Sequence, residues 1–355
     1  MHTTDIIIIG GGLSGLLTAS LLKDQLPDKK VTVLEARPEP GGRIRTLRSG
    51  NEAPLEMGAT WLTAAHTRLM ALLRRLDIEV IPQHTGSQAI YEFSVESPPQ
   101  IVQLPDGGDP SYRIKGGTDR VITALRDTLD EHQLICSTPA ETIREANDAL
   151  KIYTPAETYE ARMVISTLPP RLLASLVTFS PPLPDELMMT AAQTHTWMSE
   201  SIKVGFTYDE AFWLKPGSSG TLFSNAGPIT EFYDHSLEER HGLAGFMHDS
   251  FHSETPDRRK ELALTQLTRF YGEPATRYKS YHECVWSQEK HTHSPHKNFI
   301  VPHQNNGHPI FRESFMNGRL LLAGTETAAS HPGYMEGAVA SAERVVGKVV
   351  RGMVN

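Results

Sequence analysis

The sequence is poor in cysteine, in clustered positive charge and in long apolar runs. Its 355 residues contain two cysteines, Cys136 and Cys284, which are too few for a disulfide framework and lack the paired spacing of a structural zinc site. Acidic residues outnumber basic ones by 42 to 34, and no basic cluster could neutralise a run of phosphates. These absences argue against nucleic acid as a partner and predict a protein of the reducing cytoplasm.

Membrane-spanning and secretory signals are missing as well. The longest apolar runs, Ile6–Ile9 and Leu320–Ala323, fall far short of the ~20 residues that cross a bilayer. The N-terminus lacks a basic leader and turns directly to glycine, which is the wrong order for a secretory signal. No internal repeat or low-complexity tract occurs. With 39% apolar and 21% charged residues, the composition predicts a soluble globular chain of about two domains, with no membrane partner.

The first 36 residues follow the pattern of a βαβ unit. A strand is expected at 6–9, a helix at 13–26 and a second strand at 31–34. The glycine turn Gly10–Gly15 joins the first strand to the helix, and Glu35 ends the second strand. This is the complete dinucleotide fingerprint, in which the glycines bring the backbone close to a pyrophosphate at the helix N-terminus and the acid accepts hydrogen bonds from a ribose.

The fingerprint alone does not choose between NAD and FAD. The segment that follows, Ala36–Arg43, forms a second glycine turn with two arginines that can bring charge to the same pyrophosphate. A plain NAD domain does not need this turn, so FAD is favoured; the alternative is a solvated hairpin with surface arginines. Further along, helices are expected at 68–76, 119–129 and 334–350, and strands at 161–167, 202–208 and 320–323.

Three separated motifs resemble the flavin-dependent monoamine oxidase family. The N-terminal motif joins the glycine turn to Glu35–Arg37, Gly41–Arg43 and the loop Leu55–Trp61. The middle motif is Ile202–Val204, followed by Phe212 and Trp213, and the C-terminal motif combines Ala323–Ala328 with Gly333–Val339. Because the motifs match at both ends and in the middle, the sequence is identified as a short, soluble, bacterial-type member of that family.

The resemblance implies an α/β fold of two domains. One is a Rossmann-like FAD-binding domain of the glutathione-reductase type, expected at residues 1–60, 116–194 and 297–355. The other is an interleaved α+β substrate-binding domain with a mixed or antiparallel sheet, expected at 61–115 and 195–296. The segment 61–115 is shorter than in larger members, which implies a more open substrate site.

The resemblance also implies which residues hold FAD. They come from all parts of the chain: Gly10, Gly12, Leu13, Ser14, Gly15, Glu35, Ala36, Arg37, Gly42, Arg43, Gly58, Ala59, Thr60, Ala140, Trp286, Gly324, Thr325, Glu326, Tyr334, Met335 and Ala338. The cysteine that carries the flavin covalently in the best-known members would fall near Pro295, where this sequence has none. The FAD is therefore expected to be noncovalent.

Three residues are expected to act in catalysis. Lys203 is similar to the family's flavin-side lysine, which holds a water against the flavin, and burial would lower its pKa. Tyr334 would form one wall of the substrate slot, and His296 stands where the family has a second aromatic wall. Structural alternatives stay open for three residues: Lys203 could face solvent at a strand edge, and Tyr334 and Trp286 could be core aromatics.

The predicted function is an FAD-dependent amine oxidase. Hydride would pass from the carbon that bears the amine to FAD, and dioxygen would accept the electrons, giving hydrogen peroxide and an imine or carbonyl product. Two alternatives stay open: an FAD-dependent dehydrogenase or desaturase on a non-amine molecule, and a flavin-bound scaffold. The histidine-rich segment 282–308 lacks a familiar zinc spacing, so no metal is expected. The substrate identity and the oligomeric state are not predicted.

Overall fold

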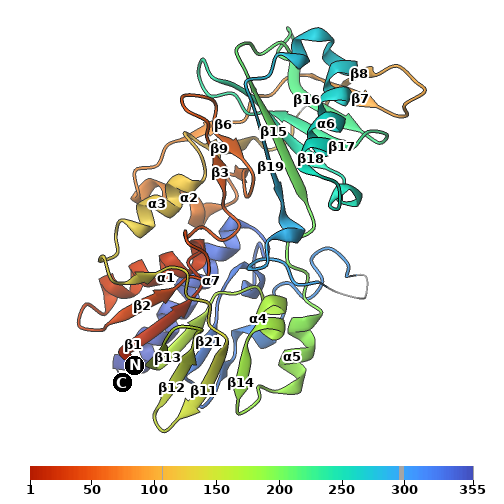
Figure 1. Cartoon of the computed structure of the whole chain (residues 1–355). Coiled ribbons are helices and arrows are strands. Elements are labelled where there is room, and N and C mark those ends of the chain that lie inside the picture. The colour runs from red at the N-terminus through yellow and green to blue at the C-terminus, as the bar shows by residue number, and fades with distance from the viewer. Residues whose placement is uncertain (106, 296–299, 355) are drawn as a thin grey trace.

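The computed structural model describes residues 1–105, 107–295 and 300–354. The chain folds into two sheet-containing parts, with both termini in the same part (Figure 1). The helices are α1 (Leu13–Gln25), α2 (Thr67–Arg75), α3 (Asp119–Arg126), α4 (Pro170–Leu176), α5 (Asp185–Ala192), α6 (Pro256–Tyr271) and α7 (Met335–Val354). Within these described residues, none of the helices combines the length and apolar character that a bilayer crossing requires.

The first sheet collects strands from the beginning, middle and end of the chain. Its order is β10 (Leu134–Ile135), β2 (Val31–Leu34), β1 (His2–Ile9), β13 (Thr158–Ser166), β12 (Ala149–Tyr153), β11 (Thr142–Ala146) and β14 (Thr178–Ser180). β21 (Leu320–Leu322) pairs with β13, and β20 (Ser314–Phe315) pairs with β21. The central pairs β2–β1, β1–β13 and β13–β21 are parallel.

Both faces of this sheet are covered, which explains the unbroken apolar run in β1. Ile6 and Ile8 pack with side chains of α1 and α7, whereas Ile7 and Ile9 pack with side chains of α4 and α5 on the opposite face. All four isoleucines are buried. A parallel strand with helices on both sides has no solvent face, so it contains no polar alternation. The predicted βαβ unit and the α/β class are confirmed.

The second sheet contains segments from two distant regions of the chain. Its order is β19 (Ser280–Val285), β15 (Ile202–Tyr208), β18 (His241–Met247), β17 (Ile229–Asp234), β16 (Ser218–Ser224), β7 (Gln88–Glu92) and β8 (Gln100–Gln103). All pairs are antiparallel except β16–β7, so the sheet is mixed, as predicted. Helix α6 packs Ala263 and Leu267 against Phe206 and Phe232 of this sheet.

Smaller sheets lie between these two parts. β3 (Thr46–Leu47) pairs with β4 (Leu55–Glu56), and β9 (Ser111–Ile114) pairs with β5 (Leu62–Thr63) and β6 (Val80–Pro82). The sequence patterns missed the strands between residues 62 and 114, because short strands offer too few positions for a periodicity. The helix expected at 119–129 ends at Arg126. The division into the two domains stated above stays a prediction.

Candidate active site

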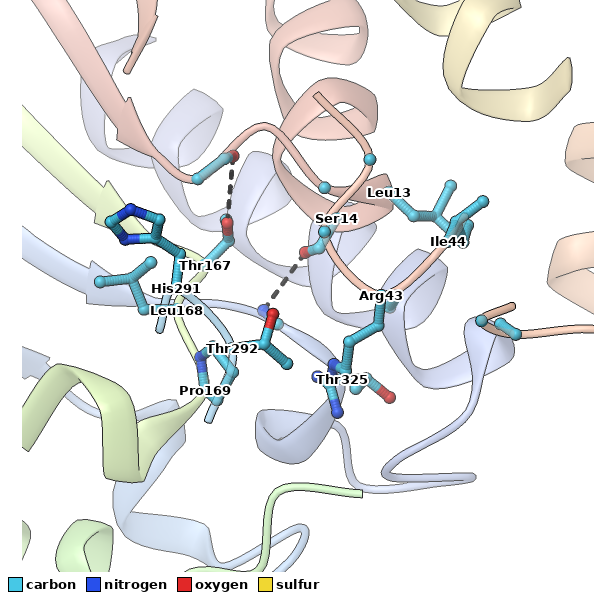
Figure 2. Close-up of a pocket in the computed structure, with 18 of the residues that line it drawn as sticks. Leu13, Ser14, Arg43, Ile44, Thr167, Leu168, Pro169, His291, Thr292 and Thr325 are labelled. Carbon is cyan, nitrogen blue, oxygen red and sulfur yellow. Dashed lines mark hydrogen bonds between the residues drawn. The ribbon is translucent and has the colours of Figure 1, made fainter. Parts of the chain in front are cut away.

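A cavity of about 590 Å³ runs between the first sheet and the second. Its lining joins the glycine turn after β1, the second glycine turn, the loop after β4, the C-terminal segment and strands of the second sheet. Figure 2 shows Leu13 and Ser14 at the start of α1, with Leu13 beside Ile44 and Ser14 directed towards the segment that contains Thr325. Ser14 Oγ accepts a hydrogen bond from the backbone N–H of Gly324 at 3.2 Å, so the two ends of the chain are joined directly at the cavity.

The glycines at one end of the cavity leave the backbone open for a phosphate group. A Cβ on Gly15 would lie 1.9 Å from the carbonyl oxygen of Gly10, so α1 can approach β1 this closely only with glycine at position 15. Gly10 has φ of +106°, which a side chain would strain. No side chain caps α1, so its first N–H groups remain available to an anion.

Glu35 lies at the end of β2 and also lines this end of the cavity. Its carboxylate accepts hydrogen bonds from the backbone N–H of Gly11 at 2.6 Å and of Arg37 at 2.8 Å. These bonds fix the carboxylate and leave it further acceptor capacity for ribose hydroxyls. The guanidinium of Arg37 donates to Gly42 O and Thr292 Oγ1, so it mainly joins the second glycine turn to the loop before Pro295.

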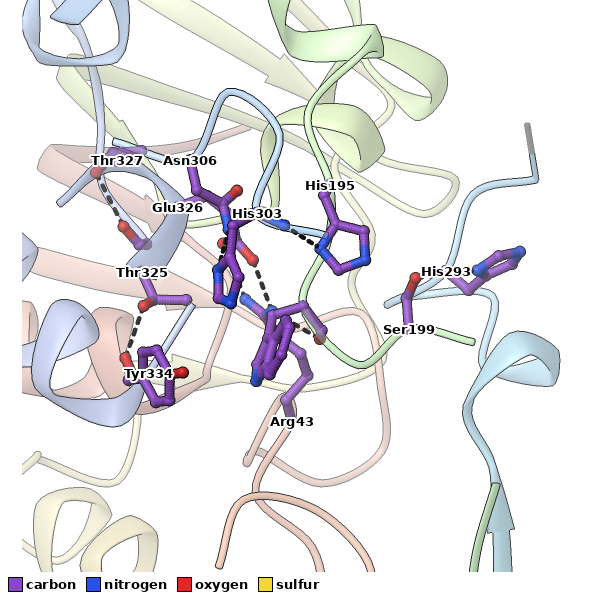
Figure 3. A network of polar contacts seen from close by, with 12 residues as sticks. Arg43, His195, Ser199, His293, His303, Asn306, Thr325, Glu326, Thr327 and Tyr334 are labelled. Atoms are coloured by element: carbon purple, nitrogen blue, oxygen red, sulfur yellow. Dashed lines mark hydrogen bonds and ion pairs between the residues drawn. The ribbon is translucent and has the colours of Figure 1, made fainter. Parts of the chain in front are cut away.

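Arg43 forms a two-point ion pair with the buried carboxylate of Glu326, with N···O distances of 2.6 and 2.9 Å (Figure 3). The same guanidinium donates to the backbone oxygen of Trp197 at 3.3 Å. Thr325 Oγ1 donates to the backbone oxygen of Tyr334 at 2.6 Å. These contacts connect the second glycine turn to Trp197 and to the segment that holds Tyr334, two of the aromatic residues of the cavity wall, and a bidentate pair holds that arrangement firmly.

Lys203 projects from β15 into the middle of the cavity and is 3% exposed. Its Nζ donates to Gly58 O at 2.8 Å and to Thr60 Oγ1 at 2.7 Å, and it lies over the rings of Trp61 and Phe246 at 5.4 and 5.0 Å. Burial lowers the pKa of Lys203 to about 8, against the opposing charge of Glu56. The neutral amine is therefore accessible close to neutral pH.

Glu56 in β4 is a second buried ionisable residue, and its carboxylate interacts electrostatically with Lys203. Burial raises its pKa to about 7, although the Thr118 N–H and the Thr46 hydroxyl donate to it at 2.7 and 2.9 Å. Because Thr118 is the residue at the N-cap position of α3, the carboxylate of Glu56 also anchors the start of that helix.

Aromatic rings surround the part of the cavity next to Lys203. Trp197 stacks on His303 with ring centroids 4.1 Å apart, and His303 stacks on Tyr334 at 5.9 Å. Trp286 donates its indole N–H to Met57 O at 2.7 Å and is 3% exposed. Trp197, Tyr334 and Trp286 all line the cavity, which gives this region an apolar wall on several sides.

Most of the sequence-predicted site residues line this cavity. The residues brought together there are Gly10, Gly12, Leu13, Ser14, Glu35, Ala36, Arg37, Gly42, Arg43, Gly58, Ala59, Thr60, Ala140, Lys203, Trp286, Gly324, Thr325, Tyr334, Met335 and Ala338. Gly15 and Glu326 lie behind the lining, where they fix the turn and Arg43. His296 lies outside the described residues. Among those residues, no group of three or more His, Cys, Asp and Glu is placed to hold a metal ion.

The lining residues that the sequence did not predict include Trp197, Glu231 and Phe246. Phe246 lies in β18, which pairs with β15, and Glu231 lies in β17, which pairs with β18. Only the strand register shows that these two side chains are neighbours of Lys203. Trp213, used as a marker for Lys203, packs in the core of the second sheet and donates to Asp234 at 2.9 Å. Trp213 therefore has a structural role in the second sheet and does not line the cavity with Lys203.

The βαβ unit and the glycine-walled cavity define a dinucleotide-binding protein. A family model described as flavin containing amine oxidoreductase matches residues 13–100 and 94–350, and the chain belongs to that family. It is thus an FAD-dependent oxidoreductase. The uncapped start of α1, the glycine packing and the accepting carboxylate of Glu35 all fit this cofactor.

Individual relatives are distant. The probable flavin-containing monoamine oxidase A of Dictyostelium discoideum is 29% identical over 255 residues, which cover 67% of this chain and 53%, about half, of that protein. Human flavin-containing amine oxidase B is 22% identical over 98% of this chain and 86% of its own. Two solved structures share the fold at 19% identity: cyclohexylamine oxidase from Brevibacterium oxydans, with a TM-score of 0.85 over 99% of this chain and 100% of its own, and putrescine oxidase bound to putrescine, with 0.83 over 98% and 99%.

Proposed function

We propose that the protein oxidises an amine with noncovalently held FAD and passes the electrons to dioxygen, which gives hydrogen peroxide. The observation that carries this proposal is Lys203, a buried lysine of lowered pKa among aromatic rings and beside the Gly58–Thr60 loop. The related proteins described above are named as amine oxidases, which agrees with this proposal. The cytoplasmic location expected from the sequence stays a prediction.

FAD, when bound, accepts a hydride equivalent from the carbon that bears the amine. Uncapped N–H groups of α1 and the carboxylate of Glu35 would hold its pyrophosphate and ribose. Neither Cys136 nor Cys284 lines the cavity, and burial raises the pKa of Cys284 to about 11, so its thiol stays protonated. These facts support noncovalent binding.

The residues of this chain would prepare the amine and handle protons. Trp197, Tyr334 and Phe246 exclude water, and an apolar site favours the neutral amine, whose lone pair is required for oxidation. In its neutral form, Lys203 uses its two N–H donors on Gly58 O and Thr60 Oγ1, which leaves its lone pair to accept a proton at Nζ. Lys203 would thus accept a proton at Nζ from a water molecule held in the cavity.

The test is an amine panel on the purified yellow protein, with peroxide measured in air and flavin bleaching measured without oxygen. Amines should reduce the flavin and yield peroxide. Flavin that stays oxidised with every amine would overturn the proposal, and reduction that is not followed by peroxide in air would indicate the dehydrogenase alternative. Lys203→Met should slow flavin reoxidation while FAD stays bound, and the exposed Lys215→Met serves as the matched control.

A further inference from the structure

Glu231 is a carboxylate of the cavity that the proposed mechanism does not use. In the described part of the chain, the lining contains one other acidic residue, Glu35, which lies at the nucleotide end. Glu231 belongs to β17 of the second sheet, beside Phe246 and Trp61. A negative charge is thus built into the substrate end of the cavity.

The strand register places Glu231 on the same sheet face as Lys203. Phe246 of β18 is directly opposite Lys203 of β15 on one side and directly opposite Glu231 of β17 on the other. Directly opposite residues point to the same face, and neighbouring strands lie about 4.8 Å apart. The Cα atoms of Lys203 and Glu231 are therefore roughly 10 Å apart, with the ring of Phe246 between them.

Neutral groups surround the carboxylate of Glu231. Tyr233 donates its hydroxyl to Oε2, and the ring of Tyr233 packs on Trp61 with centroids 4.8 Å apart. Burial, together with this hydrogen bond, raises the pKa of Tyr233, so the phenol stays protonated as a donor. Among the described residues, no lysine, arginine or histidine forms an ion pair with Glu231, and its side chain is partly exposed towards the cavity.

A carboxylate with one neutral donor, set among aromatic rings, is suited to a cation supplied by the ligand. Charge pairs gain strength where water is excluded, and aromatic faces attract the same cation. The nitrogen that is oxidised must be neutral, so it cannot supply the positive charge that pairs with the carboxylate of Glu231. A second, protonated nitrogen, several bonds away in the same substrate, can supply it.

We propose that Glu231 binds a second, protonated nitrogen of the substrate, so that the enzyme selects diamines, or amines with a distal cation, over monoamines. This inference rests on the proposed amine oxidase function. Glu231 then fixes the substrate's orientation: one end is held as a cation at β17, and the other end lies near Lys203 as the amine to be oxidised.

The test compares putrescine with butylamine, which has the same carbon chain and one nitrogen. In the unmodified enzyme kcat/KM should be about 10- to 100-fold higher for the diamine, as expected for one hydrogen-bonded charge. Glu231→Gln retains an acceptor for the Tyr233 hydroxyl and removes the charge. It should lower kcat/KM for putrescine by about the same factor and change the value for butylamine by less than about threefold. The exposed Glu239→Gln is the matched control and should change neither value.

Two outcomes overturn the inference while the proposed function stands: equal kcat/KM for both amines in the unmodified enzyme, or an equal loss for both in Glu231→Gln. If neither these two amines nor any other amine of the panel reduces the flavin, the proposed function fails on its own. Calorimetric titration of the FAD-loaded protein with putrescine then still decides the role of Glu231. Binding that weakens about tenfold or more in Glu231→Gln supports the subsite, and unchanged or absent binding refutes it.

Discussion

Replacing Lys203 by methionine should change how protein stability depends on pH. Lys203 is 3% exposed, and burial lowers its pKa from 10.5 to about 8. Between these pH values the folded state binds fewer protons at this residue than the unfolded state does. The contribution of Lys203 to folding stability therefore rises with pH across this window, because the penalty for its buried ammonium is fully present below pH 8 and is relieved by pH 10.5.

The magnitude follows from the two pKa values. At about 1.4 kcal/mol per pH unit, the window from 8 to 10.5 corresponds to roughly 3 kcal/mol. Lys203→Met also loses two hydrogen bonds, to Gly58 O and Thr60 Oγ1, but that loss is largely independent of pH and cancels in the comparison. The free energy of unfolding of the variant, relative to the unmodified protein, should fall by roughly 3 kcal/mol as the pH rises from 8 to 10.5.

Urea unfolding followed by tryptophan fluorescence at pH 8, 9 and 10.5, with saturating FAD, measures this difference. Lys215→Met, at an exposed position, should show no such trend. A stability difference between Lys203→Met and the unmodified protein that stays constant over this range would refute the reasoning, because Lys203 would then titrate alike in the folded and unfolded states.

Two further predictions concern the cofactor turn and the second buried charge. Gly15→Ala places a Cβ 1.9 Å from the oxygen of Gly10 and should abolish FAD retention, read as the flavin-to-protein absorbance ratio, whereas Gly108→Ala, in open space, should retain the flavin. Glu56 has its pKa raised by burial from 4.5 to about 7, so its contribution to stability is lost as the pH rises through this range. Glu56→Gln should gain roughly 3 kcal/mol relative to the unmodified protein between pH 4.5 and 7 in urea unfolding, and an unchanged difference would contradict the assignment.

The local half of the cofactor site could be predicted from the sequence. The turn Gly10–Gly15 and Glu35 lie within one βαβ unit, where the spacing alone sets their relative positions. The C-terminal residues Thr325 and Tyr334 needed the family resemblance, because nothing local connects them to α1. Their place in the cavity follows from the pairing of β21 with β13.

The cavity residues that come from the second sheet and from the Trp197 loop could not be predicted from the sequence, for a physical reason. Glu231 and Phe246 reach the cavity through the pairing of three strands, and a one-residue change of register would turn each side chain to the opposite face. Trp197 lies in an irregular loop and is held by a hydrogen bond from Arg43. Hydrophobic periodicity in the sequence cannot predict such a contact. The role of Arg37 was likewise hidden, since its partner Thr292 is far away in the chain.

The parallel pairing of β1, β13 and β21 has a consequence for biosynthesis. β1 is translated before its neighbour β13, which is completed at Ser166, and before the wall that contains Thr325 and Tyr334. N-terminal segments generally fold while synthesis continues. Here the cofactor can be enclosed only after Tyr334 has been translated, so the nascent chain carries β1 in an incomplete sheet until β13 and β21 have been made. Enclosure of the flavin is therefore a later step than the folding of the βαβ unit.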